Sequence, residues 1–310
     1  MRLHRRKGSA GLSGPARRRC DLAVVFAVSD GEWIGVADLL DSLRLYLDCD
    51  FEVLAVDDRT SDGTYRRLLS SGVWVVRNQV KKGLWGLDET IGKGLAATYR
   101  LFEAPFYMKI DPDALVTGFG LVDDIREAFS ASDRIGLIGT YRTDWDGGAR
   151  DLSFWRERMW RERRSIRKPL GLALRNGYEL GMGVQGGAYV LRRECLGRLV
   201  EMGWFERPRG YRPPQVRGRQ IAEDSLITML TYAAGYVAED FGGPGQPFGI
   251  WYNGLPAPPE VLRAQGRKVV HAIKYSDEES LRLREVFRGY REEDARRRSG
   301  VPRRGWSRAG

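Results

Sequence analysis

The chain of 310 residues is poor in cysteine and histidine and has no long apolar run. Its three cysteines, Cys20, Cys49 and Cys195, lack C-x-x-C spacing, which argues against a zinc site or a disulfide framework and suits a reducing cytoplasm. No apolar stretch approaches the ~20 residues that cross a bilayer, and the basic N-terminus lacks the apolar segment of a signal peptide. The composition therefore predicts a soluble, cytoplasmic protein.

Basic residues are unevenly distributed, although the net charge of the whole chain is +10. Residues 1–19 carry +7 and residues 291–310 carry +4, which leaves residues 20–290 at −1. The body thus lacks the basic surface of a nucleic-acid-binding protein, and we expect no specific nucleic-acid partner. The two ends are expected to be solvated, disordered tails. Weak contact with an anionic surface, such as the inner face of the membrane, is the interaction that suits them.

Short apolar strands alternate with amphipathic helices from about residue 21, a pattern typical of a parallel α/β sheet. Residues 21–140 are therefore predicted to form a nucleotide-binding half of a single domain. The pattern predicts strands at 22–28, 51–56, 73–77, 106–110 and 134–139, and helices at 34–47, 62–69, 88–102 and 120–129.

The rhythm changes after Thr140, and residues 141–275 are predicted to form a second, less regular half of the domain. An Arg-rich stretch at 153–168 is expected to be an irregular helical insertion, with Trp155 and Trp160 docked onto their own domain. The remaining expectations are a strand at 186–191, a loop at 207–219, a helix from 222, a long loop at 242–259, a strand at 268–273, and a C-terminal helix with a basic tail at 276–310.

Residues 106–115, F-Y-M-K-I-D-P-D-A-L, are the most informative stretch of the chain. The apolar run predicts a buried strand that ends at two carboxylates, Asp111 and Asp113. Residues two apart in an extended chain share a side, so both carboxylates are expected at the strand's carboxyl edge, where open α/β sheets bind ligands. Like charges so close repel, and a divalent cation that carries a diphosphate is the commonest reason to place them together.

A second acidic run follows the strand predicted at 51–56, with the sequence V-D-D-R-T-S-D-G-T. Carboxylates after a strand accept hydrogen bonds from a ribose or a nucleobase in nucleotide-binding folds. A helix cap explains Asp62 fully, but it explains the adjacent pair Asp57 and Asp58 poorly. We therefore expect Asp57 and Asp58 to bind the nucleoside and Asp62 to be structural.

In order, strand context and separation, these two motifs resemble the GT-A-fold glycosyltransferases, which use nucleotide-sugar donors. Their large inverting family two carries V-V-D-D-G-S-x-D-G-T at this place, followed further along the chain by a strand that ends in D-x-D. Here the second motif is Asp111-Pro112-Asp113. Arg59 and Thr60 stand where the family has Gly-Ser, which leaves the base specificity open.

Two downstream motifs extend the resemblance. The stretch 186–193, G-G-A-Y-V-L-R-R, looks like the Gly-rich strand on the acceptor side of these enzymes. The sequence A-E-D-S, which contains Glu223 and Asp224, resembles the Glu-Asp that opens a helix in inverting members, where the Asp is the catalytic base. By itself an Asp at a helix start is equally well explained as a cap or a dipole partner. The order of the motifs favours the base.

His271 and Lys274, in H-A-I-K, complete the set. Taken alone, His271 ends an apolar strand and is also explained as a core histidine whose hydrogen bonds are made within the protein. Several GT-A enzymes place a His after the Glu-Asp helix as a third metal ligand, with a Lys shortly after it against the diphosphate. The resemblance thus implies that Asp113, Asp111 and His271 hold Mn²⁺ or Mg²⁺ and that Lys274 contacts the donor.

The resemblance implies a single GT-A (Rossmann-like) α/β domain with a mixed, mostly parallel central sheet flanked by helices and acceptor-side insertions. It implies that residues 21–140 form the nucleotide-sugar-binding half and residues 141–275 the acceptor-binding and catalytic half. It implies transfer of a sugar, with a UDP-sugar as the commonest donor, to a glycan, lipid-linked or small-molecule acceptor, with inversion. Trp251 and Tyr252, in the long loop, are candidate acceptor-site residues. The Q-x-x-R-W motif of polymerising synthases is missing, so single addition fits better than processive synthesis.

Two alternatives remain open at the level of sequence. One is a haloacid-dehalogenase-like phosphatase, whose strand also ends in D-x-D. Those enzymes usually place D-x-D at the first strand and follow it with Gly-Thr, whereas here three strands precede it and Ala114-Leu115 follow. The other is a GT-A-like fold kept as a non-catalytic binding module, against which the complete set of acidic and His residues argues.

Overall fold

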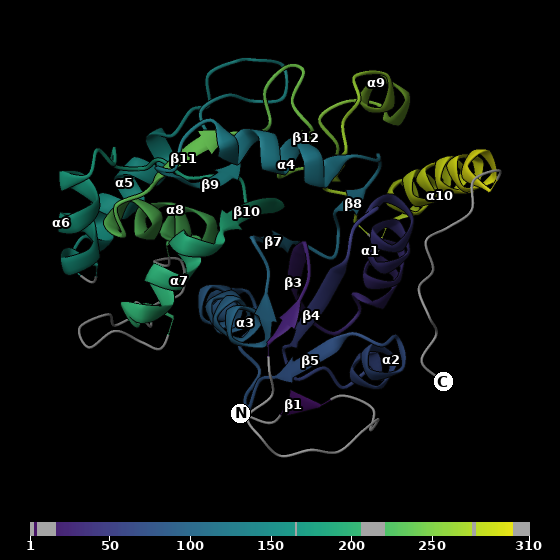
Figure 1. Ribbon diagram of the computed structural model, residues 1–310, viewed down its shortest axis with the longest axis horizontal. Helices are drawn as coiled ribbons and strands as arrows, with labels where there is room; N and C mark the ends of the chain where they lie inside the picture. Colours follow the sequence, from purple (N-terminus) through teal and green to yellow (C-terminus); the bar gives the residue numbers. More distant parts are fainter. Residues whose placement is uncertain (1–2, 5–16, 165, 206–220, 275–276, 300–310) are drawn as a thin grey trace.

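A mixed sheet of eight strands forms the centre of the molecule, in the order β1-β5-β4-β3-β7-β10-β9-β11 (Figure 1). The computed structural model describes residues 3–4, 17–164, 166–205, 221–274 and 277–299. The strands of this sheet are β1 (Leu3–His4), β3 (Leu22–Val28), β4 (Phe51–Asp57), β5 (Trp74–Arg77), β7 (Phe106–Ile110), β9 (Ile135–Gly139), β10 (Ala188–Arg192) and β11 (Val237–Asp240).

One half of the sheet is parallel, because β5, β4, β3 and β7 all run in the same direction. Strand β10 is antiparallel to both of its neighbours, β7 and β9, and β11 is parallel to β9. The parallel half places the carboxyl ends of β4 and β7 at one edge. The mixed, mostly parallel sheet predicted from the sequence is therefore confirmed.

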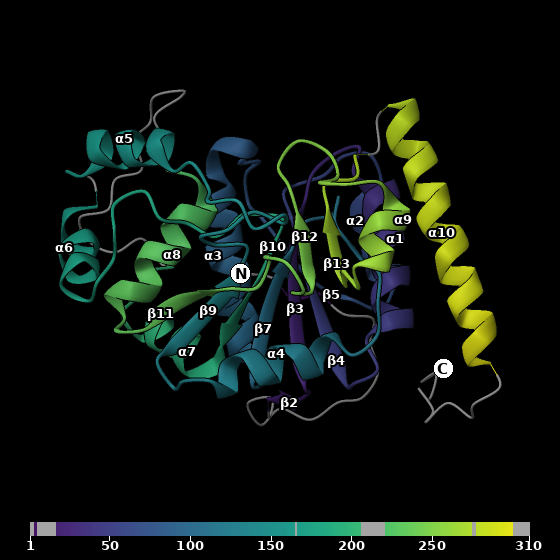
Figure 2. The ribbon, with the colours of Figure 1, turned by 90° about the horizontal axis from the view of Figure 1, so that it is seen from above.

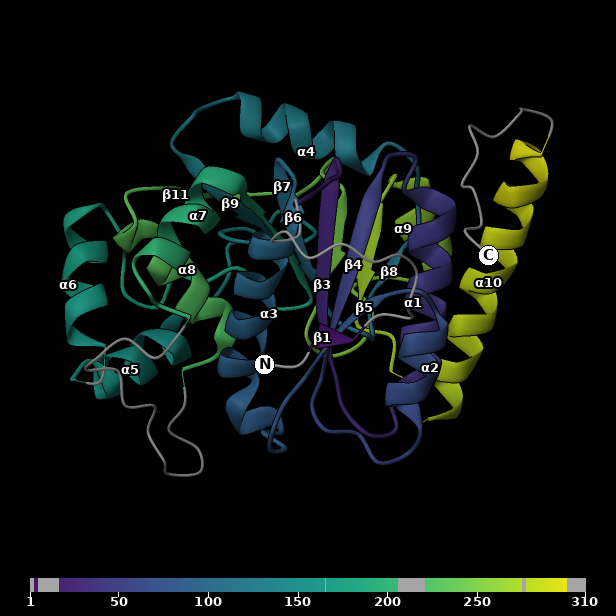
Figure 3. The same cartoon turned by 60° about the horizontal axis from the view of Figure 1, so that its bottom comes forward.

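Helices cover both faces of this sheet, which is why its central strands are continuous apolar runs (Figures 1 and 3). Every residue of β3 is buried, and alternate residues point to different cores. Helices α3 (Leu87–Leu101), α7 (Arg193–Glu201) and α8 (Glu223–Ala233) supply one core. Helices α1 (Trp33–Tyr46), α2 (Thr64–Ser70) and α4 (Leu121–Ser130) supply the other.

A second sheet of three short strands, in the order β12-β13-β8, lies beside the first (Figure 2). Strand β13 (Val269–His271) pairs in parallel with β12 (Phe248–Ile250) and antiparallel with β8 (Leu115–Val116). Because β8 follows β7 after only a few residues, this pairing brings the end of β13 to the end of β7. The helices α9 (Pro259–Ala264) and α10 (Glu278–Arg298) follow β12 and β13, respectively.

Most predicted elements begin and end within two residues of the observed ones, but two predicted regions of the second half differ. The long loop expected at 242–259 contains β12, a strand too short to stand out between glycines and prolines. The insertion expected at 153–168 forms two regular helices, α5 (Ser153–Glu162) and α6 (Arg167–Arg175), so α6 extends beyond the predicted end. The loop predicted at 207–219 lies outside the described residues.

The C-terminal basic stretch differs from a solvated tail over its first part. Residues 291–298 belong to α10, and Arg291 is buried. The smaller elements are β2 (Arg18–Arg19), β6 (Phe102–Glu103) and the 3-10 turn η1 (Leu84–Gly86). Among the described helices, none combines the length and the apolar character needed to traverse a lipid bilayer.

Candidate functional site

The two carboxylates of the D-x-D motif lie at the carboxyl end of β7, as the strand pattern predicted. The backbone N–H of Asp111 donates to the carbonyl of Gly187 at 2.9 Å, and the N–H of Ala114 donates back to the carbonyl of Asp111 at 3.0 Å. The second bond closes a tight turn that contains Pro112, whose ring fixes φ and favours such a turn. The turn fixes the backbone of Asp111 at the carboxyl edge of the parallel sheet, and Asp113 is almost completely buried there.

Asp111, Asp113 and His271 form a cluster that could hold a metal ion. One ligand atom of each residue lies within 4.8 Å of the other two. His271 comes from β13, so the cluster joins the central sheet to the three-stranded sheet. Two carboxylates and one imidazole form a ligand set that suits Mn²⁺ or Mg²⁺. The structure therefore brings together the three residues that the sequence assigned to a metal.

The hydrogen bonds of His271 define which ring nitrogen is available. Its Nδ1 faces the carbonyl oxygen of Trp251 at 2.7 Å, and a carbonyl can only accept, so we assign the proton to Nδ1. In the neutral ring the lone pair is then on Nε2, which lies 3.1 Å from Oδ1 of Asp113. Two acceptors at that distance repel, so a proton or a metal ion must separate them. An Nδ1–H bonded to a backbone carbonyl is the usual support of a metal-binding histidine.

Lys274 contacts the other oxygen of Asp113. Burial raises the pKa of Asp113, but in the metal-free site a proton on Nε2 of His271 and the Lys274 ammonium outweigh it and hold the pKa well below its usual range; a bound metal ion would take the place of that proton. The Lys274 side chain is about half exposed, at 50%. The Asp113 carboxylate is therefore ionised, and a partly exposed ammonium lies beside it, where it can also reach an anionic ligand.

Lys109, which the sequence analysis did not select, lies at the centre of a buried charge network. Its ammonium is 2.8 Å from Asp111, 3.6 Å from Glu223, and donates to the carbonyl of Gly186. Burial lowers the pKa of Lys109, but the charges of Asp111 and Glu223 raise it more, so it stays protonated. The sequence contained a signal for the buried position of Lys109, namely a single lysine in the middle of the apolar strand F-Y-M-K-I. A lysine is almost never fully buried unless it is paired.

Glu223 and Asp224 occupy the first turn of α8, where the helix dipole favours negative charge. Burial raises the pKa of Glu223 to about 7, although Lys109 acts in the opposite direction. The hydroxyl of Tyr189 donates to Glu223. Burial also raises the pKa of Asp224, against a 2.6 Å hydrogen bond from the N–H of Ser225. A carboxylate with a raised pKa is a stronger proton acceptor, as a general base requires.

Two adjacent glycines separate Asp224 from the metal cluster. A Cβ atom at Gly186 would lie 3.2 Å from Oδ2 of Asp224, and one at Gly187 would lie 2.4 Å from the ring of His271. Consecutive Cα atoms are ~3.8 Å apart, so Asp224 and His271 approach neighbouring points of one backbone segment. The absence of side chains in this Gly-Gly pair thus leaves room for the α8 carboxylate beside Gly186 and for the β13 imidazole beside Gly187.

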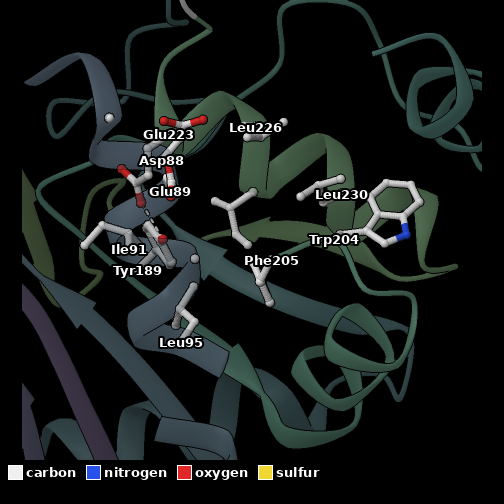
Figure 4. A pocket seen from close by; sticks show the side chains of 13 residues that line it. Asp88, Glu89, Ile91, Leu95, Tyr189, Trp204, Phe205, Glu223, Leu226 and Leu230 are labelled. Atoms are coloured by element: carbon white, nitrogen blue, oxygen red, sulfur yellow. Dashed lines mark hydrogen bonds between the residues drawn. The ribbon is translucent and has the colours of Figure 1, made fainter. Parts of the chain in front are cut away.

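A cavity of about 80 Å³ lies between α3 and α8, beside the Tyr189–Glu223 hydrogen bond (Figure 4). Carboxylates of Asp88, Glu89 and Glu223 lie toward one end (Figure 4). Apolar side chains form most of the remaining wall, namely Ile91, Leu95, Trp204, Phe205, Leu226, Ile227 and Leu230. Burial of Glu223, which removes water from its carboxylate, is the main cause of its raised pKa, and the charges of Asp224 and Asp111 act in the same direction.

Asp57 and Asp58 lie at the end of β4, but both are buried and engaged by the protein itself. Asp57 accepts hydrogen bonds from the hydroxyl and the N–H of Thr60 and lies 2.8 Å from Nε of Arg77. Asp58 accepts from the side chain of Asn78 and from the N–H groups of residues 82 and 83, at 2.7–3.1 Å. These bonds hold the loop after β5 at this edge. That Asp57 and Asp58 contact a nucleoside stays a prediction.

Two further residues of this run have clear structural roles. Asp62 accepts from the N–H of Thr64 at 3.0 Å and from the N–H of Gly31 at 2.7 Å, so it is structural, but the N-cap of α2 is Gly63 and not Asp62 as the sequence suggested. Arg59 has φ of 58°, a left-handed conformation that costs roughly 1–2 kcal/mol outside glycine. The family that this run resembles has glycine at the position of Arg59, and the backbone conformation explains that preference.

The aromatic candidates differ in exposure. Trp155 is half-buried, but Trp160 is 57% exposed, so the expectation that both dock onto their own domain is wrong for Trp160. Trp160 is instead covered on one face by the guanidinium of Arg163, 4.1 Å from the ring centroid. Trp251 and Tyr252 lie together, with ring centroids 5.3 Å apart, and Tyr252 is 73% exposed. Trp251 also supplies the carbonyl that holds His271.

No protein-family model matches this sequence, and no curated protein matches it either. Solved structures of glycosyltransferases do match in fold. The mannosyltransferase PcManGT from Pyrobaculum calidifontis, solved with GDP-Man and Mn²⁺, aligns with 92% of this chain and 68% of its own, at 17% identity and a TM-score of 0.43. Glucosyl-3-phosphoglycerate synthase from Mycobacterium tuberculosis, solved with Mn²⁺, UDP and glucosyl-3-phosphoglycerate, aligns over 92% and 82%, at 14% identity and a TM-score of 0.41.

A third match is S. aureus TarS, at 16% identity and a TM-score of 0.41, of which this chain spans only 35%. The matched structures include those of GT-A glycosyltransferases, and the three TM-scores are all below 0.5. The likeness is one of fold alone, and the residues described above carry the chemistry proposed below.

Proposed function

We propose that this protein is a metal-dependent glycosyltransferase that moves a sugar from a nucleotide-diphosphate sugar to a hydroxyl of an acceptor. The observation that supports this most directly is the convergence of Asp111, Asp113 and the Nε2 lone pair of His271. Such a cluster at the carboxyl edge of a parallel sheet suits a divalent cation and a phosphorylated ligand. The cation, Mn²⁺ or Mg²⁺, would neutralise the charge that builds on the leaving diphosphate.

The donor is proposed to lie along the edge formed by β4 and β7. Lys274, half exposed beside Asp113, binds a phosphate oxygen of the donor. Asp57 and Asp58 border the nucleoside from the end of β4, together with the loop that Asp58 holds through the N–H groups of residues 82 and 83. We take UDP as the first nucleotide to test.

Asp224 is proposed as the general base. It accepts the proton of the acceptor hydroxyl while the hydroxyl oxygen forms a bond to the anomeric carbon and the bond from that carbon to the diphosphate oxygen breaks. Attack from the face opposite the leaving diphosphate inverts the anomeric configuration. Glu223 is held by Tyr189 and Lys109 and orients the first turn of α8. The acceptor is a glycan, a lipid-linked sugar or a small molecule, and a single sugar is added.

Turnover of a panel of nucleotide sugars with Mn²⁺, with and without Asp224→Asn, tests this proposal. We expect the substitution to abolish transfer while nucleotide affinity stays within about twofold of the unaltered protein. Asp123→Asn is the matched control, because Asp123 is an exposed acid in the first turn of α4. Weakened donor binding in Asp224→Asn would refute the assignment of the base. If no nucleotide binds the unaltered protein, the non-catalytic binding module is favoured instead.

A further inference from the structure

Helix α10 reaches the candidate metal site through one buried side chain, that of Arg284. This guanidinium is 1% exposed. Its Nε donates to the carbonyl of Lys274 at 2.8 Å, and its Nη2 donates to the carbonyl of Ile273. Arg284 thus holds two consecutive carbonyls of the segment that follows His271 directly in the sequence.

Arg284 is itself anchored to α1 through Asp38, a buried carboxylate. Nη1 of Arg284 lies 3.1 Å from one oxygen of Asp38, and Nη2 of Arg291 lies 2.8 Å from the other. Both arginines come from α10, which packs beside α1 (Figure 2). Burying three charged groups is costly, and such an arrangement is weak evidence for stability. It is better explained by the orientation that it imposes on the segment it bonds.

The same segment is also bonded to the metal-site turn. The N–H of Ile273 donates to the backbone carbonyl of Asp113 at 2.7 Å, and the Lys274 ammonium contacts the carboxylate of Asp113. Ile273 and Lys274 lie beyond the end of β13, so their carbonyls have no ladder partner. The carbonyl of the buried Ile273 needs a hydrogen-bond donor, and Arg284 provides it while also bonding the carbonyl of Lys274.

We propose that Arg284 is a positioning residue for the donor-phosphate end of the site, an inference that rests on the function proposed above. By holding the carbonyls of Ile273 and Lys274, it orients Lys274, and with it the end of β13 that carries His271, toward Asp113. Only an arginine can do this, because a planar guanidinium donates in several fixed directions at once, whereas a lysine ammonium cannot span two carbonyls and a carboxylate. The C-terminal helix is thereby part of the donor site without contacting the donor.

The experiment compares Arg284→Met and Arg284→Lys with Arg288→Met in the full chain. Arg288 also lies near Asp38, at 3.4 Å, but it is 52% exposed and is thus the matched control. The lysine substitution keeps a cation for Asp38 and so guards against loss of the fold. Two quantities are measured: the affinity for UDP with Mn²⁺, and the rate of amide hydrogen exchange at Ile273 in the absence of ligand.

We expect both Arg284 variants to bind Mn²⁺ and UDP at least about tenfold more weakly and to exchange the Ile273 amide faster, with Arg288→Met unchanged in both. Unchanged exchange at Ile273 in the Arg284 variants would overturn the positioning role, whatever their affinity. If the Arg284 variants exchange the Ile273 amide faster but the unaltered protein does not bind UDP, the positioning role is supported and the proposed function is contradicted instead. The experiment thus distinguishes a failure of the positioning role of Arg284 from a failure of the proposed function.

Discussion

Nε2 of His271 lies 3.1 Å from Oδ1 of Asp113, while Nδ1 of the same ring is held at 2.7 Å by the carbonyl of Trp251. The two residues belong to different sheets, so this contact depends on the pairing of β13 with β8. The carbonyl of Trp251 fixes one side of the ring, and Nε2 on the other side is directed at the Asp113 carboxylate. This arrangement prepares a cation site before any cation binds.

Substitution of Gly187 by alanine should displace His271. The new methyl group would lie 2.4 Å from Cγ of the imidazole, closer than Cβ atoms approach in proteins. We expect Mn²⁺ affinity, measured by calorimetry, to fall at least about tenfold. Gly289→Ala is the control, because nothing lies within 4 Å of the added methyl group there. Equal Mn²⁺ affinity of the two variants would show that His271 does not need its present position.

Lys109→Met should destabilise the fold strongly. It leaves the buried carboxylate of Glu223 and the partly exposed one of Asp111 without their shared cation, and removing the partner of a buried charge typically costs about 3–5 kcal/mol. Urea unfolding measures this loss in the free energy of unfolding. Lys93→Met, which removes an exposed partner of Glu89, should cost less than about 1 kcal/mol. Adding Glu223→Gln to Lys109→Met should restore part of the loss, and a Lys109→Met protein as stable as the unaltered one would contradict the buried network.

The stability of the protein should fall as the pH rises through the range in which Glu223 ionises. The pKa of Glu223 is raised from 4.5 to about 7 in the folded state, so the folded protein binds this proton more tightly than the unfolded chain. The stabilisation by the proton is fully present below about pH 4.5 and is lost as the pH rises through 7.

Glu223→Gln removes this titration and isolates its contribution. Between pH 5 and pH 8, urea unfolding of the unaltered protein should lose on the order of 2–3 kcal/mol more than that of the variant. Parallel pH profiles of the two proteins would mean that the Glu223 carboxylate is not desolvated in solution.

Arg59→Gly should be more stable than Arg59→Ala by about 1 kcal/mol, because only glycine adopts φ of 58° without a steric cost. Both variants lose the hydrogen bond from Arg59 to the carbonyl of Gln79, so the comparison isolates the backbone conformation. Thermal or urea unfolding compares the stability of the two variants. An alanine variant as stable as the glycine variant would place this residue outside the left-handed region in solution.

The sequence predicted the local part of the structure well. The strand β3 could be predicted because it is an unbroken apolar run, and the positions of Asp111 and Asp113 followed from such a strand ending in two carboxylates. These signals depend on neighbouring residues only. The resemblance to GT-A enzymes then suggested His271 and Lys274 as partners, and the structure brings them to Asp113.

Contacts between distant segments could not be predicted in this way. The bonds from Asp58 to residues 82 and 83 and the ion pair from Lys109 to Glu223 depend on how loops and helices meet at the sheet edge. The same is true of Arg291, whose basic sequence context resembled a solvated tail but whose guanidinium is buried against Asp38. Its burial requires the docking of α10 on α1, which no local pattern encodes.

The central claim is that Asp113 and its neighbours bind a divalent cation together with a nucleoside diphosphate. Calorimetric titration of UDP into the purified protein, first with Mn²⁺ and then with EDTA, tests it most directly, with Asp113→Ala as the matched variant. The account predicts binding with Mn²⁺ that disappears both with EDTA and in Asp113→Ala. Binding of UDP that is unaffected by EDTA, or that survives in Asp113→Ala, would contradict it.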